Sequence, residues 1–439
     1  MAVTLGEGDV IGDGAHAIWV RDGRAAVLLD NQGHGVKRLP WAIVFSSRLD
    51  ESYPVEVRRS ITPLTAAKIS ANSAFRFAAP FIATIAADLD VSLATLGGAI
   101  AAGELVGLTA PLLTRVAGRM TRRTAVWTGL LGIACAAAVC ATSGHVVQFA
   151  IGLMVLNMSK IVFDLGIIAW ITDRVAYGQL GRVIGLTETA WAGGLFIGVV
   201  LMGLLTGVTS WRWGYGLAIV AIVGFAALLR ARLPAEPRPT RIGHVARVRP
   251  RIGAGWWVIA GTAALTGGAQ ALFVTFGKWL EQDFDYSETE IAIVIFCLGA
   301  VELLATSATV RFADQWGKQR SAMYGAVAIV PAGLGLAFVT HNAIAGLVMI
   351  AAFIAAFEFA IVVTVSLASN LVPGTPSAGL GFMVGAGTLG RAIMATPATA
   401  AFTRFGMWMP AVLGASCAAI TVTCQWRYRA SRRHLRQPA

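Results

Sequence analysis

Several polar and ionisable side chains stand inside segments of the sequence that are otherwise apolar. The stretch 157–166 reads NMSKIVFDLG, in which Lys160 and Asp164 are one helical turn apart. Burial favours the neutral form of a carboxyl group and a nearby cation favours its ionised form, so such a pair can bind and release a proton. The other polar residues at or near comparable depth are Asn72, Arg76, Glu104, Glu188, Gln270, Glu302, Glu358 and Arg391.

The composition indicates that these groups are embedded in a helical membrane protein. Of the 439 residues, 56% are hydrophobic and 13% are charged, whereas soluble domains carry about 25% charged residues. Many apolar segments reach the roughly 20 residues that a membrane-spanning helix needs. The formal net charge of +12 does not indicate nucleic-acid binding, because the cations lie between apolar segments and at the chain ends. The cysteines lie inside apolar segments without metal-ligand spacing, so we expect no metal and no cofactor.

The apolar segments predict an all-α membrane protein with twelve transmembrane helices. We place them at about 62–86, 93–113, 124–143, 146–171, 183–207, 212–230, 254–280, 290–309, 321–340, 343–371, 379–403 and 407–426. Basic residues concentrate in the tails and in the loops after even-numbered helices, which by the positive-inside rule places both termini in the cytoplasm. We therefore expect a multi-pass protein of the cell (inner) membrane.

The predicted helices form two halves of six. We expect an N-terminal bundle at 62–230, a cytoplasmic linker at 231–253, a C-terminal bundle at 254–426 and a basic cytoplasmic tail at 427–439. The loop AGRMTRRTAVWTG recurs as ADQWGKQRSAMYG, 196 residues later, so that Gly129 corresponds to Gly325. Duplicated six-helix halves are typical of secondary transporters.

Residues 1–61 are expected to be an N-terminal cytoplasmic extension. Within it, HAIWVRDGRAAVLLDNQGHG predicts a short β-hairpin around Arg21-Asp22-Gly23. The segment is too small for a core of its own, so we interpret it as an appendage, or as the product of a start codon placed too far upstream.

The distribution of charge along the helices predicts a shared polar cavity. A charged side chain at the bilayer centre costs roughly 2.5–3.5 kcal/mol, so seven of them facing lipid would cost on the order of 20 kcal/mol. Predicted helices 3, 6, 9 and 12 carry no central charge, while the remaining helices hold the polar groups. A central cavity lined by those remaining helices explains this sorting.

Local alternatives stay open for several of these residues. Lys160 and Asp164, at i and i+4, can neutralise each other along one helix. Glu188 can bond a neighbouring loop, and Lys68 can extend its ammonium group to the membrane surface. Arg391 has no carboxylate on its own helical turn, so it requires a partner on another helix or a ligand.

With these features the sequence resembles the major facilitator superfamily over about residues 62–428. The family's loop motif after helices 2 and 8 is matched by VRFADQWGKQR in the second copy and only partly by TRVAGRMTRRT in the first, where Gly118 replaces the aspartate. The resemblance implies a cytoplasmic gate formed by Arg119, Arg122, Asp314, Gly317, Lys318 and Arg320.

Helix 5 is similar to the family's antiporter motif. The residues in register are Gly185, Gly194, Gly198 and Gly203. Glycines at this spacing also suit ordinary packing between membrane helices, so the motif leaves both readings open.

The resemblance implies a secondary transporter, and we expect a proton-coupled exporter of small organic molecules. In this hypothesis Asp164 or Glu104 pairs with Arg76 or Lys160, protonation breaks the pair, and the two halves rock about the site. The alternative is a proton symporter or uniporter that imports a small anionic metabolite, which the cations near the cavity favour. A non-transporting membrane sensor or scaffold is a third hypothesis.

The expected partners are a small-molecule substrate, protons and the lipid bilayer. We expect no nucleic acid and a monomeric protein. An enzyme is not expected, because no nucleophile–base set, metal cluster or phosphate-binding loop is present in the sequence.

Overall fold

The computed structural model describes residues 16–18, 27–29, 53–117, 119–175, 180–234, 253–368, 371 and 376–434. Contacts divide the chain into residues 1–48 and residues 49–439. In the first unit, β1 (His16–Ile18) pairs antiparallel with β2 (Val27–Leu29). This pairing confirms the short hairpin expected there, whose turn residues lie outside the described part of the chain.

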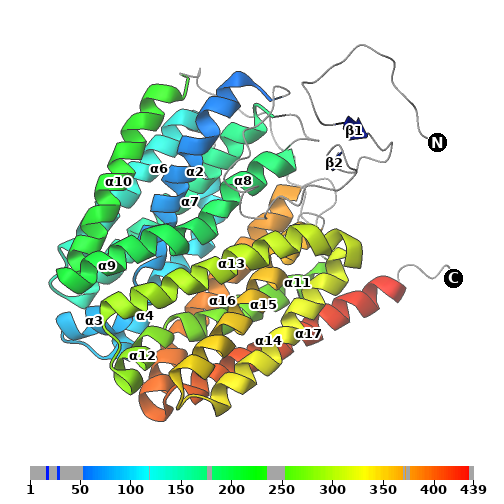
Figure 1. Cartoon of the computed structure of the whole chain (residues 1–439). Coiled ribbons are helices and arrows are strands. Elements are labelled where there is room, and N and C mark those ends of the chain that lie inside the picture. Colours follow the sequence, from blue (N-terminus) through cyan, green and yellow to red (C-terminus); the bar gives the residue numbers. More distant parts are fainter. Residues whose placement is uncertain are drawn as a thin grey trace. The chain divides into compact units, whose positions relative to one another are not determined.

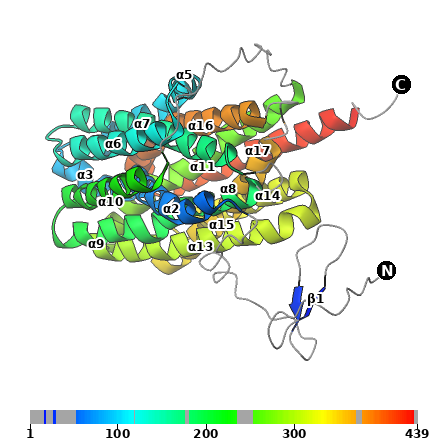
Figure 2. The same cartoon turned by 90° about the horizontal axis from the view of Figure 1, so that it is seen from above.

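The second unit is built from helices (Figures 1 and 2). Its first half contains α2 (Val55–Arg76), α3 (Ile82–Asp88), α4 (Leu93–Leu105), η1 (Val106–Thr109), α5 (Ala110–Ala117), α6 (Arg122–Ala141), α7 (Val146–Thr172), α8 (Leu180–Gly193), the π-helical turn η3 (Gly194–Val199), α9 (Val200–Val208) and α10 (Trp211–Arg232). Its second half contains η4 (Gly253–Gly255), α11 (Trp256–Phe273), α12 (Phe276–Phe284), α13 (Glu288–Trp316), α14 (Lys318–Phe338), α15 (Ala343–Ala368), α16 (Pro376–Phe405) and α17 (Trp408–His434). Consecutive short helices join into the expected all-α fold of two six-helix bundles.

The helical segments agree with the expected membrane spans in part. Within the described ranges, nine helices are long and apolar enough to cross a membrane, or ten if one bent pair is counted as a span. The segments expected at 62–86, 93–113 and 379–403 are not among the nine. The first of them, α2, carries more charged residues than the apolar membrane-spanning helices do, including Arg58, Lys68 and Arg76.

Two segments expected to be continuous are broken, which corrects the prediction from the sequence. The first begins at Val55 rather than near residue 62, and it ends at Arg76 before α3 starts at Ile82. Pro80 lies in this break, where its missing backbone N–H leaves no helical hydrogen bond to lose. The segment expected at 254–280 divides into α11 and α12 and continues to Phe284.

Close helix packing inside each half depends on glycine. A Cβ atom at Gly129 of α6 would lie 2.7 Å from the backbone of Phe163 in α7. A Cβ at Gly325 of α14 would lie 2.9 Å from the backbone nitrogen of Ala360 in α15. Gly129 and Gly325, which the sequence repeat matches, therefore have the same role in the two halves. Each lets an equivalent pair of helices approach closely.

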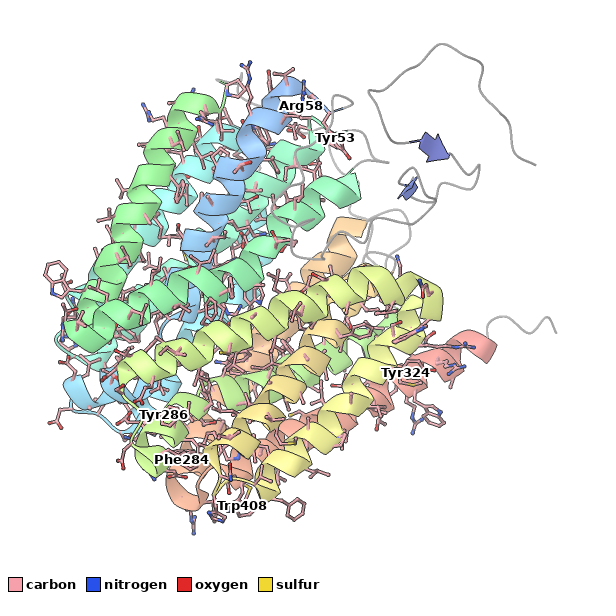
Figure 3. All side chains as sticks on the ribbon, in the orientation of Figure 1. Tyr53, Arg58, Phe284, Tyr286, Tyr324 and Trp408 are labelled. Atoms are coloured by element: carbon pink, nitrogen blue, oxygen red, sulfur yellow. The ribbon has the colours of Figure 1, made fainter. Side chains whose placement is uncertain are left out.

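The two ends of the helical unit differ in how the halves meet. We call the end where α2 begins and α17 ends the terminal end, and the end with loops 89–92, 209–210 and 285–287 the distal end. Figure 3 labels Tyr53 and Arg58 at the terminal end and Tyr286 at the distal end. Toward the terminal end the ribbons of the two halves diverge (Figure 1).

Contacts between the halves lie toward the distal end. A Cβ at Gly203 of α9 would lie 2.9 Å from the Cβ of Ala292 in α13. The hydroxyl of Thr84 in α3 donates to the carboxylate of Glu288 in α13 at 3.4 Å. The conformation is therefore one in which the halves meet at the distal end and separate toward the terminal end.

We expect Gly129→Ala to lower the midpoint of thermal unfolding. The added methyl group would press on the backbone of Phe163, and overpacking of this kind costs about 1–3 kcal/mol. Gly224→Ala in α10 is the matched control, because nothing lies within 4 Å of its added Cβ and alanine is the better helix former by about 1 kcal/mol. Scanning fluorimetry of the two purified variants measures the difference. Equal midpoints would contradict the close packing of α6 on α7.

Candidate functional site

A cavity of about 100 Å³ lies between the two halves of the helical unit. Its walls come from α2, α4, α7, α8, η3 and the α2–α3 connection on one side, and from α11, α15 and α16 on the other. The side chains with chemical or aromatic character that line it are Phe75, Arg76, Glu104, Trp191, Thr266, Gln270, Phe273, Phe357 and Arg391. The cavity is thus an aromatic space with a few charged and polar groups.

Two ion pairs cross from one half to the other beside this cavity. Arg76 of α2 binds Glu302 of α13 through two hydrogen bonds, from Nη1 at 2.9 Å and from Nη2 at 3.0 Å. Arg391 of α16 binds Glu104 of α4 through Nε and Nη2, both at 2.9 Å. Paired, parallel hydrogen bonds of this kind are the strongest contacts between arginine and carboxylate. Arg391 therefore has the partner on another helix that its sequence context required.

The carboxylates of the two crossing pairs occupy similar places in the two halves. Glu104 stands on α4 and Glu302 on α13, the second membrane-spanning segment expected in each half, and each reaches an arginine of the opposite half. The side chains of Arg76, Glu302 and Glu104 are 8%, 2% and 7% exposed. Charges this deeply buried are stable only when paired, so the two pairs tie the halves together.

A second group of charges lies within the first half. The ammonium of Lys160 donates to Asp164 at 2.6 Å, which confirms the local i, i+4 pair on α7. The ammonium of Lys68 donates to Glu188 of α8 at 2.7 Å and lies 4.0 Å from Asp164. Lys68 is 5% exposed at its side chain, so the alternative in which it extends toward the membrane surface, which the sequence left open, does not hold. A carboxylate on a neighbouring helix provides the better partner.

Aromatic rings cover two of the cations near the cavity. The guanidinium carbon of Arg76 lies 4.9 Å from the ring centre of Trp191 and 5.5 Å from that of Phe273. The ammonium of Lys160 lies 5.6 Å from the ring centres of both Phe75 and Trp191. Cations in such positions are attracted to the negative face of the ring. The rings therefore stabilise the charges and also provide apolar walls.

Sequence reasoning missed these aromatic residues. Phe75 directly precedes the expected Arg76, and Trp191 follows Glu188 by three residues on the same helix. Both positions are close enough to an expected charge to have been considered. Their residue type alone did not indicate a place in the cavity wall, because an aromatic residue in a membrane helix usually packs against lipid or against other helices.

The predicted site residues do not all face the same space. Arg76, Glu104, Gln270 and Arg391 line the cavity. The other six, which lie outside its lining, are Asn72, Lys160, Asp164, Glu188, Glu302 and Glu358. Asn72 instead donates its side-chain amide to the carbonyl of Ala190 at 2.9 Å, which ties α2 to α8.

The pairing expected for the carboxylates is correct for one residue and wrong for another. Asp164 does bind Lys160. Glu104 binds Arg391, and Arg76 has Glu302 instead. The cause is tertiary: α4 lies against α16 of the opposite half, so the nearest cation to Glu104 comes from far along the chain.

The residues assigned to the loop motifs are only partly brought together. Arg122 donates to Asp173 at the end of α7 at 2.9 Å, within the first half. Arg119, Lys318 and Arg320 are exposed, and Gly317 takes a φ of +83° between α13 and α14, a conformation that favours glycine. The side chain of Asp314 lies outside the described part of the structure.

Three of the four glycines of the helix 5 motif stand at close approaches. A Cβ at Gly194 would meet Asn72 at 2.8 Å, and a Cβ at Gly198 would meet the Cβ of Ser73 at 2.5 Å, so both let α2 pack tightly on η3. Gly203 faces Phe81 and Ala292. Nothing lies within 4 Å of a Cβ at Gly185. The glycines therefore serve packing, including one contact across the halves.

The described residues offer no metal centre, since no three His, Cys, Asp or Glu side chains among them are grouped to hold an ion. The site is an ion-paired cavity between two similar bundles, and its geometry suits the binding and passage of a small molecule. Known proteins that resemble this chain indicate which kind of protein has such a cavity.

Solved structures resemble this one over most of their length. One is a bacterial homolog of the human lysosomal transporter Spinster, in an inward-facing and unoccupied conformation, with a TM-score of 0.67 at 13% identity, over 86% of this chain and 98% of that one. Another is the human organic anion transporter MFSD10 (TETRAN), with a TM-score of 0.60 at 17% identity, over 85% of this chain and 100% of that one. At these identities the likeness establishes the fold.

Sequence comparison identifies the family. An uncharacterized MFS-type transporter, YwfA of Bacillus subtilis (strain 168), is 29% identical over 126 residues, which span 29% of this chain and 30% of that relative. The sequence profile of the Major Facilitator Superfamily matches residues 64–398, well over half of the chain. The chain therefore belongs to the major facilitator superfamily, a family of transporters rather than of enzymes.

Proposed function

We propose that this transporter is a proton-coupled exporter of small amphipathic organic molecules. The observation that carries the proposal is the aromatic, ion-paired cavity between the two halves, bordered by Arg76–Glu302 and Glu104–Arg391. A site between two bundles is exposed to one side of the membrane and then to the other as the bundles rock. Carboxylates that exchange a cation for a proton supply the coupling.

The walls of the cavity support an organic substrate with an apolar or aromatic body. Phe75, Trp191, Phe273 and Phe357 provide ring surfaces, and the amide of Gln270 is a neutral polar group among them. Small-molecule sites typically combine mostly apolar walls with a few polar groups that fix orientation. Because each lining arginine is bound to a carboxylate, the cavity has little net charge to select a simple anion.

The conformation and the charge distribution support export. The positive-inside rule assigns the terminal end to the cytoplasm of the cell membrane, with both termini there. The halves diverge toward that end, so substrate would load from the cytoplasm (Figure 1). The helix 5 glycines serve packing in this structure, so the support for export comes from the conformation and the charge distribution.

The alternative of an importer for an anionic metabolite has weaker support. It would require a cation free to bind the substrate, and the described cations near the cavity each have a carboxylate partner. MFSD10 carries organic anions by its description, yet it shares only 17% of its sequence with this chain. A scaffold that binds nothing would have no need of a cavity with this lining.

Transport by the purified protein tests the proposal. A thermal-shift screen of metabolites and drugs identifies ligands, because a ligand stabilises the state that it binds. Each ligand is then loaded into proteoliposomes, and its flux is measured with a pH gradient imposed in each direction. We expect the ligand to move in the direction opposite to the imposed proton flow, and we expect a protonophore to abolish this movement. A ligand whose flux is identical with and without the gradient would refute proton coupling.

We expect the Arg76–Glu302 pair to show strong coupling in a double-mutant cycle. Glu302→Gln or Arg76→Gln alone leaves a buried charge without its partner, a loss of about 3–5 kcal/mol. The double variant leaves no lone charge and should lose much less than the sum. The half-exposed pair Lys278–Glu281 is the control, and ion pairs near the surface contribute about 0–1 kcal/mol. Thermal unfolding measures all variants, and additive losses at Arg76 and Glu302 would contradict the crossing pair.

A disulfide at the distal end should lock the protein in this conformation. A Cβ at Gly207 would lie 3.4 Å from the Cβ of Thr289 in the other half, close to the Cβ spacing of about 3.5–4.5 Å in disulfides. We expect Gly207→Cys/Thr289→Cys, in a background without native cysteines, to lose flux on oxidation and regain it on reduction. The single variants are the controls. Full flux with the disulfide formed would show that the distal contact does not open during transport.

A further inference from the structure

The charged side chains in and around the cavity form ion pairs with one another in the described helices, except for a single carboxylate. Four ion pairs are formed: Lys68–Glu188, Lys160–Asp164, Arg76–Glu302 and Arg391–Glu104. Glu358 of α15 is the fifth carboxylate of this set, and no described cation lies within ion-pair distance of it. It is 5% exposed. A buried carboxylate without a cation is costly, and the cost is removed when the group takes up a proton.

The surroundings of Glu358 are polar on one side only. One carboxyl oxygen, Oε1, lies 3.0 Å from the hydroxyl oxygen of Thr306 in α13. The other, Oε2, is buried without a hydrogen-bond partner in the described structure. Among the charged groups, Glu302 of α13 and Arg76 of α2 are near enough to interact with it.

The other helices packed against α15 bring no further charge to Glu358. These helices are α11, α14 and α16. The described part of α11 contains no charged residue. In α14, Lys318 and Arg320 stand in the first turn, and Arg391 of α16 is engaged with Glu104.

The hydroxyl of Thr306 gives a geometric sign of the protonation state. Its oxygen lies 3.0 Å from the backbone carbonyl of Glu302 and 3.0 Å from Oε1 of Glu358. A hydroxyl has a single hydrogen to donate and two lone pairs to accept with. If it donates to the carbonyl one turn back, as threonine in helices commonly does, the contact with Glu358 requires a hydrogen from the carboxyl group. A protonated Glu358 satisfies both contacts.

We propose that Glu358, with Thr306 as its hydrogen-bond partner, is the proton-binding site of this transporter. In the conformation described, the carboxylic acid donates to Thr306. The assignment as the coupling proton rests on the proposed function. The residue differs from Asp164 and Glu104, whose protonation would leave Lys160 or Arg391 without a partner.

Loss of this proton acts on the contact between the halves. The carboxylate that forms at Glu358 places a second negative charge near Glu302, and the two carboxylates then compete for Arg76. Competition weakens the Arg76–Glu302 pair that ties α2 to α13. Proton release therefore loosens this contact between the halves beside the cavity, and proton binding restores it.

Infrared difference spectroscopy of the protein in lipid, between acidic and alkaline pH in sodium-free buffer, tests the site without a substrate. We expect a protonated-carboxyl band that shifts in D₂O and disappears as the pH rises. Glu358→Gln should lose it, while Asp164→Asn and the exposed Glu188→Gln should keep it. Persistence of the full band in Glu358→Gln, or its absence from the wild type, would overturn the proposal.

Thr306 gives a second, independent test if Glu358→Gln does not fold. Thr306→Ser keeps the hydroxyl and should keep the frequency of the band. Thr306→Val has nearly the same shape without the hydroxyl, and we expect a shifted frequency and a changed pH of disappearance. An identical band in wild type, Thr306→Ser and Thr306→Val would contradict the assignment.

Two further measurements show which ion the site binds and distinguish failure of the site from failure of the proposed function. Loss of the band on adding sodium at constant pH would show a site for alkali cations, which overturns a proton site. In proteoliposomes, a Glu358 band without gradient-driven flux would leave the proton site intact and refute proton-coupled transport. Gradient-driven flux that is unchanged in Glu358→Gln would refute the site and leave the proposed function standing.

Discussion

The cost of placing charge inside a membrane governs the architecture of this transporter. The described helices carry four cations and five carboxylates in otherwise apolar segments, and the structure reduces the cost by pairing all of them except Glu358. Two of the pairs, Arg76–Glu302 and Arg391–Glu104, use partners from different halves. The same interaction that makes the charges tolerable therefore also holds the two bundles against each other around the cavity.

The contacts inside the halves and between them differ in kind. Inside a half, glycines such as Gly129 and Gly325 let helices approach to backbone contact, and this packing has no charged element that could be switched. Between the halves, the bidentate ion pairs are contacts that depend on both partners keeping their charge. Alternating access requires that each half moves as one body, and tight packing inside the halves with charged contacts between them suits that movement.

The candidate site was predicted from the sequence in outline and missed in detail. The depth of Arg76, Glu104 and Arg391 within apolar segments was enough to predict a shared cavity, because charge that deep has no other stable position. The cavity's rings, such as Trp191, were missed, because an aromatic residue has many stable positions in a membrane protein. The burial of Lys68 stayed open, because a lysine near a helix end can reach water or a neighbouring carboxylate, and only the position of α8 decides between them.

The sequence by itself determined the class of protein, most of its apolar membrane-spanning segments, the repeat between its halves and the family to which it belongs. These features depend on composition and periodicity, which are local properties of the chain. The tertiary structure decided which carboxylate each arginine binds and that Glu358 has no cation among the described residues. It also decided that the first and seventh expected segments are interrupted after α2 and after α11. Such partners are up to 287 positions apart in the chain, so only the packing of one half on the other brings them together.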